Sequence, residues 1–312
     1  MASNALKAGR FFRPSPQQLI SAIRGLPGIS HMQLCAELDP LYGGCCDDHS
    51  FKLAAPTDEP FIEKFADDLA RMVESIWIEK GMPESIDPVI TKAYADTIYK
   101  AVQEGFGNTL SSIAYDTPDY EMLLSLQRDV YQFSAAKNYQ QLKALTEALV
   151  GEDGQLRSKR EFRQAAFEIN DTHIGRYLDV EREHAIGSAQ MASNWVNIQA
   201  NKDVLPILEF DAILDGRTTY NCRSLNGVRK PVGDQFWLYN YPPLHWRCRS
   251  LVRQYAASRG ITPDQDIVYP DTPEMFKTNC AAQGVIFPPK HPYYIGLPDS
   301  VRKDGLNLIE NE

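Results

Sequence analysis

The hydrophobic period of the chain changes at Val204, and this change constrains the fold more than any other feature of the sequence. Upstream of Val204, apolar residues recur at every third or fourth position, which is the spacing of helices with one buried face. Downstream, every second residue from Leu208 to Leu214 is apolar, as in a strand with one face mostly buried. We therefore expect an α+β fold, with a mainly helical N-terminal and central region followed by a small C-terminal β-meander on helices.

Capping and turn residues divide the helical region into successive helices. Asp58 is a candidate N-cap ahead of Pro60, and Thr117 is a candidate N-cap ahead of Pro118. The expected helices lie at 58–82, at 88–104, from 117 to the glycines at 151 and 154, and in the tracts SKREFRQAAFEI and IGRYLDVEREHAIGSAQMASNWVNI.

The region after Val204 contains two strong turn signals. Asn226-Gly227 is typical of a two-residue β-hairpin, and Tyr241-Pro242-Pro243 forces an extended turn ahead of a short strand in CRSLVRQY. Four aromatic residues of this region are expected to form its core rather than a base-stacking platform, namely Trp237, Tyr239, Tyr241 and Trp246.

The net charge of −9 conceals a basic segment. Residues 215–260 contain eight basic and two acidic side chains, a local charge of +6 that leaves −15 on the rest of the chain. Such a segment can face an acidic partner surface, a nucleic-acid backbone or the chain's own helices, and we favour a protein surface over nucleic acid. The candidate contact residues are Arg223, Arg229, Lys230, Arg247 and Arg253.

Cys222, His245 and Cys248 are the residues here whose types suit a metal ion. The His-x-x-Cys spacing on a turn would let His245 and Cys248 converge on one ion. A fourth ligand is not evident, although Asp215 could serve, and Thr219 stands where a paired Cys-x-x-Cys element would need a cysteine. The alternatives are a packed pair of buried thiols or a disulfide between Cys222 and Cys248.

Enzymatic use of the same residues lacks a complete set of groups. Cys222 with His245 could form a nucleophile and base, but nothing marks an oxyanion hole. A nuclease built on His245 and the arginines likewise has parts without an arrangement, so we expect no enzyme activity.

Two further groups of residues are expected to be structural. Asp215 and Arg217 lie two positions apart at a strand end, where an ion pair or a carboxylate that accepts turn amides would fix the strand's exit. The other group matches no zinc pattern and comprises His31, Cys35, Cys45, Cys46 and His49.

The sequence also predicts that the chain does not associate with membranes. It contains no apolar run of membrane-spanning length, and its N-terminus lacks the apolar segment of a secretory signal. We expect reduced thiols if the compartment is a cytoplasm.

The order of these elements resembles the phage head morphogenesis domain, the phage Mu protein F-like family of minor head proteins. The resemblance covers about residues 170–255 and includes EREHAIGSAQMASNW, DGRTTYNCRSLNG and YPPLHWRCRS. Members often have further cysteines where Thr219 and Ser250 stand, and this departure favours a structural clasp over an inherited metal site. The matching positions are Asp215, Arg217, Thr218, Cys222, Leu225, Gly227, Pro231, Pro242, Pro243, His245, Cys248 and Arg249.

The resemblance implies a minor head (capsid) protein of a tailed phage or prophage that acts in head morphogenesis and docks at or near the portal vertex. It would be made in the host cytoplasm and incorporated into the virion. Its partners would be the portal protein and the major capsid or scaffolding protein, with packaged DNA as a further candidate. The competing classes are a metal- or His-dependent nuclease or toxin-type enzyme, and a DNA-binding packaging accessory protein. No cofactor is expected, except for a structural zinc ion as the alternative at Cys222, His245 and Cys248.

Pattern and resemblance together divide the chain into four parts. Residues 1–56 form an extended N-terminal arm or small subdomain, and residues 57–170 form a helical domain. Residues 171–260 form the head morphogenesis domain, and residues 261–312 form a C-terminal extension.

Overall fold

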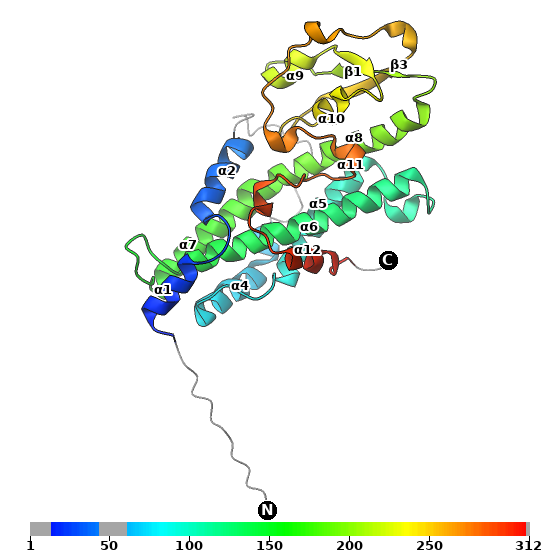
Figure 1. Ribbon diagram of the computed structural model, residues 1–312. Coiled ribbons are helices and arrows are strands. Elements are labelled where there is room, and N and C mark those ends of the chain that lie inside the picture. Colours follow the sequence, from blue (N-terminus) through cyan, green and yellow to red (C-terminus); the bar gives the residue numbers. More distant parts are fainter. Residues whose placement is uncertain (1–13, 44–60, 310–312) are drawn as a thin grey trace, which may run out of the picture.

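Three long helices form the centre of the molecule. The computed structural model describes residues 14–43 and 61–309. Helices α5 (Pro88–Phe106), α6 (Pro118–Glu147) and α8 (Asp179–Asn201) pack against one another along their length (Figure 1). Helix α7 (Lys159–Asp171) runs into α8 through a π-helical segment, η2 (Thr172–Leu178). Shorter helices cover this centre: α1 (Pro16–Arg24), α2 (His31–Gly43), α3 (Phe61–Lys64), α4 (Ala66–Glu79) and the 3-10 turn η1 (Leu110–Ser112).

Polar side chains cap the first turns of these helices, and Thr117 is the cap that the sequence predicted. The Asp87 carboxylate accepts hydrogen bonds from the backbone N–H groups of Val89 and Ile90, and Thr117 Oγ1 accepts one from Tyr120 N–H. Ser158 caps α7 in the same way. The helix predictions for α5, α6, α7 and α8 are confirmed. The single helix expected over 58–82 is divided at Phe65 into α3 and α4, and its predicted cap Asp58 and Pro60 lie outside the described residues.

The N-terminal region was expected to be an extended arm or a small subdomain, and its described residues form two helices. Residues 16–43 contain α1 and α2, and α2 buries Leu34, Leu38 and Tyr42 in the main core. These three residues follow an i, i+4, i+8 spacing, so they form one helical stripe. The stripe is easily missed because Pro40 lies inside it.

A small antiparallel sheet lies at one end of the long helices (Figure 1). Its strands are β1 (Ile207–Asp211), β2 (Arg229–Pro231) and β3 (Leu251–Tyr255), in the order β2-β1-β3. The α+β class is confirmed. The strand order differs from a sequential meander, because β1 lies in the middle and β2 and β3 flank it. The connections carry helices instead of tight turns, with α9 (Tyr220–Leu225) before β2 and α10 (Phe236–Asn240) after it.

Asn226-Gly227 is not a hairpin turn. Asn226 ends α9, and Gly227 has a φ of 79°, a left-handed conformation that favours glycine. The N–H of Gly227 donates to the carbonyl of Phe210, and Asn226 Oδ1 accepts from Ala212 N–H. The pair therefore leads the chain from the end of α9 to the edge of β1. The left-handed conformation of Gly227 serves to end a helix and not to reverse a hairpin.

The C-terminal extension packs back onto the long helices. After the 3-10 turns η3 (Ala257–Arg259), η4 (Asp264–Asp266) and η5 (Glu274–Phe276), it forms α11 (Cys280–Gln283), η6 (Pro292–Tyr294) and α12 (Asp299–Leu306). Helix α11 contacts α8, whereas η6 and α12 contact α6. Among the described residues, none of the helices has the length and hydrophobicity needed to cross a membrane.

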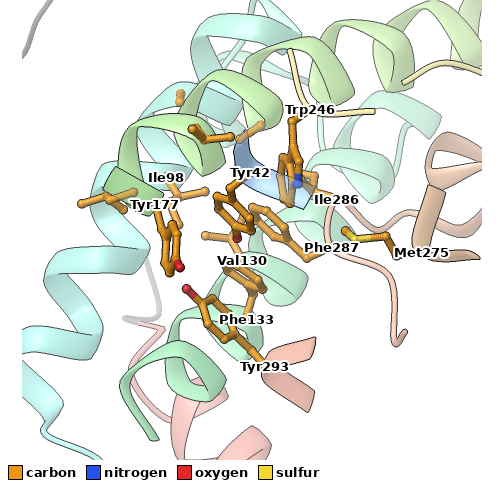
Figure 2. Close-up of a cluster of buried hydrophobic side chains, with 14 of the residues drawn as sticks. Tyr42, Ile98, Val130, Phe133, Tyr177, Trp246, Met275, Ile286, Phe287 and Tyr293 are labelled. Carbon is orange, nitrogen blue, oxygen red and sulfur yellow. The ribbon is translucent and has the colours of Figure 1, made fainter. Parts of the chain in front are cut away.

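One hydrophobic core runs through all of these segments. Figure 2 shows Tyr42 of α2, Phe133 of α6, Trp246 of the turn before β3, and Phe287 and Tyr293 of the C-terminal extension packed together. The rings of Phe133 and Phe287 stack with their centroids 3.6 Å apart. The core thus contains residues from all four parts into which the sequence was divided. The boundaries between these four parts stay a prediction.

The aromatic residues of the C-terminal region follow the prediction with one exception. Trp237, Tyr241 and Trp246 are buried. Tyr239 is 55% exposed, so its assignment to the core is wrong. In α10, Trp237 lies on the buried side and Tyr239, two residues later, lies on the opposite side, as the helical period requires.

Gly105→Ala is expected to destabilise the protein, although alanine is the better helix former. A Cβ at position 105 would lie 2.2 Å from the carbonyl oxygen of Ile186, where α5 crosses α8. Overpacking of this kind costs about 1–3 kcal/mol, which outweighs a propensity gain of about 1 kcal/mol. Urea unfolding would measure the change, with Gly233→Ala as control because a Cβ there meets nothing within 4 Å. An unchanged or higher stability of Gly105→Ala would contradict this close crossing.

Asp129 should make stability depend on pH. Its Oδ2 accepts hydrogen bonds from the N–H groups of Ile286 and Phe287, at 2.7 and 2.9 Å, and burial raises the pKa of Asp129 to about 7. The pKa of Asp129 is higher in the folded state than the unfolded value of 3.8. Its contribution to the free energy of unfolding is therefore fully present below pH 3.8 and is lost as the pH rises through about 7. The stability of the wild type relative to Asp129→Asn should therefore fall across this window. A constant difference between the two proteins from pH 4 to 8 would contradict the shift.

Candidate functional site

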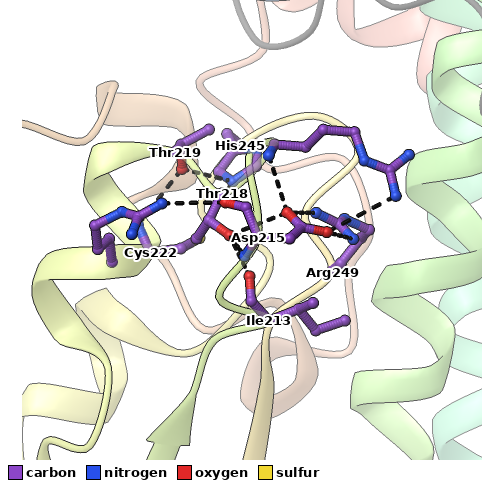
Figure 3. A network of polar contacts seen from close by, with 9 residues as sticks. Ile213, Asp215, Thr218, Thr219, Cys222, His245 and Arg249 are labelled. Carbon is purple, nitrogen blue, oxygen red and sulfur yellow. Dashed lines mark hydrogen bonds and ion pairs between the residues drawn. The ribbon is translucent and has the colours of Figure 1, made fainter.

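Asp215, which follows β1, binds Arg249, which lies two residues before β3. Its two carboxylate oxygens accept hydrogen bonds from the guanidinium of Arg249, at 2.9 and 2.7 Å (Figure 3). Oδ1 also accepts from the backbone N–H of Arg217 at 2.9 Å, and the Arg217 guanidinium lies 3.8 Å from Oδ2. The expected ion pair and the expected turn contact are thus both present. The partner that the sequence reasoning did not assign to Asp215 is Arg249.

The local backbone holds this carboxylate in place. Asp215 N–H donates to Thr218 Oγ1 at 2.9 Å, and Thr218 Oγ1–H donates to the carbonyl of Ile213. The pKa of Asp215 lies well below its usual range, first because Arg249 donates to the carboxylate and then because of the Arg217 N–H. The carboxylate is therefore charged and paired with Arg249 at neutral pH.

The hydrogen bonds around Asp215 predict how Asp215→Ala behaves. Loss of the carboxylate should speed the hydrogen exchange of the Arg217 amide, because its acceptor is removed. Amides of β1 should keep their protection, since the strand is paired on both sides. Exchange measured by NMR would show this, with Asp266→Ala in an exposed turn as control. Unchanged exchange at Arg217 would contradict the account of the turn.

The second group of residues places two thiols and an imidazole together. Cys222 Sγ lies 3.2 Å from His245 Nε2 and 3.6 Å from Cys248 Sγ, and the donor atoms of all three residues lie within 4.8 Å of one another. Both thiols are free and buried. The structure thus favours adjacent thiols over the disulfide alternative. We call Cys222, His245 and Cys248 the Cys-His cluster.

The environment of the Cys-His cluster fixes the orientation of His245. The Nδ1 atom lies 2.7 Å from the carbonyl oxygen of Trp246, which can only accept, so Nδ1 carries the proton. The lone pair on Nε2 then faces Cys222 Sγ and also Thr219 Oγ1, which lies 3.0 Å away. Thr219 in turn caps α9 by accepting from the N–H of Cys222.

Asp215 is not the fourth ligand that the sequence left open. Its carboxylate is engaged by Arg249 and is not part of the group of atoms that lie within reach of one ion. The other motif residues are structural: Gly227 ends the connection after α9, and Pro243 follows Pro242 through a cis peptide bond in the turn that carries His245.

The basic residues expected to face a partner are mostly paired within the chain. Lys230 is buried and pairs with Asp264, which excludes it as a contact residue. Arg247 pairs with Glu183 of α8 at 2.5 Å. The remaining pairs are Arg253 with Asp211 at 2.5 Å, Arg229 with Glu209 at 3.7 Å, and the guanidinium of Arg223 with the carbonyl of Asp215 at 3.1 Å. The basic segment therefore neutralises acidic groups of its own chain. The expected contact with the chain's own helices is made by Arg247, whereas Arg229 and Arg253 pair with acidic residues of β1.

A pocket of about 340 Å³ lies beside the motif. Its apolar lining comes from Ile186 and Met191 of α8 and from Ile213, Pro243 and Leu251. Cys248 and Arg249 also line it, so the pocket borders both polar groups described above. Most of the residues that line it are apolar.

The second histidine and cysteine group is only partly described. His31 and Cys35 lie one turn apart on α2, with Cys35 Sγ 3.7 Å from His31 Nε2. Cys45, Cys46 and His49 lie outside the described residues.

Sequence reasoning missed a buried polar group in the helical centre. Lys137 Nζ donates to Glu181 Oε2 at 2.7 Å, and both side chains are fully buried. The hydroxyl of Tyr42 donates to Glu181 Oε1 at 2.9 Å and lies 3.2 Å from His291 Nε2. A signal was available, because Lys137 lies four residues after Phe133 on the apolar stripe of α6.

Comparison with known proteins confirms the resemblance. Residues 140–253 match the family described as Phage Mu protein F like protein. This match begins about 30 residues earlier than the sequence motifs indicated, inside α6, and it ends inside β3. It therefore includes α7, α8, β1, β2, the Asp215 contacts and the Cys-His cluster.

A curated relative is named "Putative capsid assembly protein F" and comes from Escherichia phage Mu. It is 32% identical over 72 residues, which is 23% of this chain and 16% of that protein. The chain thus spans less than a fifth of the relative it matches. No solved structure is significantly similar to the chain. Together the two matches support a phage head-related protein.

Proposed function

We propose that the chain is a minor head protein of a tailed phage or prophage, which acts in head morphogenesis and docks at or near the portal vertex. The observation that carries the proposal is the family match over residues 140–253, which includes the Asp215 contacts and the Cys-His cluster. The similarity to a protein named for capsid assembly points in the same direction. In this proposal the chain is made in the host cytoplasm and becomes part of the virion.

The geometry of the matched region, residues 140–253, supports an assembly role rather than an enzymatic one. The motif residues hold segments of the chain together: Asp215 binds Arg249, and His245 is fixed by Thr219 and by the Trp246 carbonyl. The proposal therefore assigns these residues to the shape of a docking surface. Cleavage of plasmid DNA or RNA that disappears in His245→Ala would contradict this and favour a nuclease.

The charges and exposed apolar residues of the matched region suit a protein partner better than packaged DNA. Four of the five candidate basic residues form ion pairs with acidic side chains of this chain, so few positive charges remain for phosphates. By contrast, Ile213 and Leu251 are 46% and 36% exposed and line the pocket beside the motif. The portal protein and the major capsid or scaffolding protein are the proposed partners. DNA binding that weakens steeply with salt would favour a packaging accessory protein instead.

Co-purification from the encoding phage or prophage tests the docking site. The tagged chain should retain the portal protein in a fixed ratio, and Ile213→Asp with Leu251→Asp should lose it because a charge enters the pocket wall. Leu238→Asp is a matched control, since Leu238 is 49% exposed and does not line the pocket. Portal retention that is unchanged in the double variant would remove the pocket from the proposed interface.

A further inference from the structure

We propose that the Cys-His cluster binds one zinc ion, which joins the connection after β1 to the turn before β3. Cys222, His245 and Cys248 supply two sulfur ligands and one nitrogen ligand, a donor set that suits zinc. Cys222 is separated from Cys248 by 26 positions, so the ion would close a loop that contains α9, β2 and α10.

The distances between the donor atoms fit a tetrahedral ion. With zinc–sulfur bonds of about 2.3 Å and a zinc–nitrogen bond of about 2.0 Å, sulfur atoms are separated by about 3.8 Å and sulfur and nitrogen by about 3.5 Å. The observed separations are 3.6 Å between the two sulfurs and 3.2 Å between Cys222 Sγ and His245 Nε2. The third separation, between Cys248 Sγ and His245, lies within 4.8 Å, so all three donors lie close enough together to surround one ion after a small adjustment.

His245 is already oriented as a ligand. Zinc-bound histidines donate their second ring N–H to a carbonyl or carboxylate, which fixes the ring and its tautomer. The bond from Nδ1 to the Trp246 carbonyl supplies this contact. Because the Trp246 side chain is 1% exposed and packed in the main core, the position of His245 is set by the core itself.

The cluster offers three ligands, and Thr219 is a polar side chain that contacts it. Thr219 Oγ1 is 3.0 Å from the ligand nitrogen Nε2, while Asp215 is occupied by Arg249. A neutral hydroxyl is a weak ligand, so a water molecule would complete the coordination. Two thiolates balance the charge of the zinc ion, which suits the burial of both cysteines. The role we infer for the ion is structural.

Metal analysis of the purified full chain tests the proposal without any phage assay. A protein isolated through a tag that does not bind metals should contain one zinc ion per chain. Cys222→Ser and Cys248→Ser should lose it, whereas Cys35→Ser, which changes a free thiol on α2, should keep it. Cobalt substituted for zinc should give the absorption bands of thiolate coordination, and these should be absent in Cys222→Ser. A wild-type chain that neither contains zinc nor binds it when added, or zinc retained equally in all variants, would overturn the proposal.

Thr219→Cys keeps the test informative if the cysteine variants fail to fold. This change adds a thiolate next to His245 and Cys222 and keeps the three proposed ligands. In competition with a chelator, it should hold zinc at least tenfold more tightly than the wild type. Ser224→Cys is the control, because Ser224 lies on the same helix and is not within the cluster. An equal affinity of Thr219→Cys and the wild type would place the ion elsewhere and overturn the assignment.

Discussion

Lys137→Met is expected to lower the free energy of unfolding by about 3–5 kcal/mol, because it leaves a buried carboxylate without its cation. Lys137 and Glu181 are both fully buried, and their charged atoms lie 2.7 Å apart. Among the described residues, the Tyr42 hydroxyl would remain as the hydrogen-bond donor to Glu181. Methionine preserves the length of the side chain, so the cost reports the lost charge rather than a cavity.

The matched control for this change is Lys92→Met. Lys92 pairs with Asp96 at 2.9 Å on the exposed side of α5, four positions away in the same helix. A surface pair of this kind contributes about 0.3–0.5 kcal/mol. Urea unfolding of both variants gives the comparison, and the double variant Lys137→Met with Glu181→Gln should recover part of the loss. Equal costs for Lys137→Met and Lys92→Met would contradict the buried pair.

Trp246→Ala should cost about 3–5 kcal/mol, the range for a large aromatic residue removed from a core. The indole is 1% exposed and lies 4.6 Å from the ring of Tyr42 and 5.5 Å from that of Phe276, measured between centroids. It therefore connects the motif turn to α2 and to the C-terminal extension. Removal of the indole should lower the stability of the whole fold and also loosen the turn that positions His245.

Tyr239→Ala separates this effect from a general sensitivity of the region. Tyr239 is 55% exposed and lies in the same C-terminal region, so its truncation should change stability by less than about 0.5 kcal/mol. Thermal or urea unfolding of both variants provides the measurement. A small loss in Trp246→Ala would mean that the motif turn is not anchored in the helical core.

The helices could be predicted because their signals are local. A cap such as Thr117 and an apolar stripe such as that of α6 are read within one turn or a few turns of chain. The order of the strands could not be predicted in this way, because it depends on connections that contain α9 and α10. Asn226-Gly227 shows the same limit: a left-handed glycine can reverse a hairpin or end a helix, and the tertiary contacts of Phe210 decide between them.

The candidate site could be predicted in part for the same reason. The residue types indicated Cys222, His245 and Cys248, and the His-x-x-Cys spacing on a turn placed the last two close together. The partners that tune the site come from other segments: Thr219 lies 26 positions from His245, and Arg249 lies 34 positions from Asp215. The pairing of the arginines is equally long-range, as Arg247 meets Glu183 of α8 only in the folded chain.

Quantitative mass spectrometry of purified heads tests the central claim most directly. Heads from the encoding phage or prophage should contain the chain at a low copy number that is constant relative to the portal protein. Deletion of the gene should reduce the yield of complete heads, and expression of the intact chain should restore it. Purified infectious particles and assembly intermediates that all lack the chain, with normal head yield after deletion, would contradict the role in head morphogenesis.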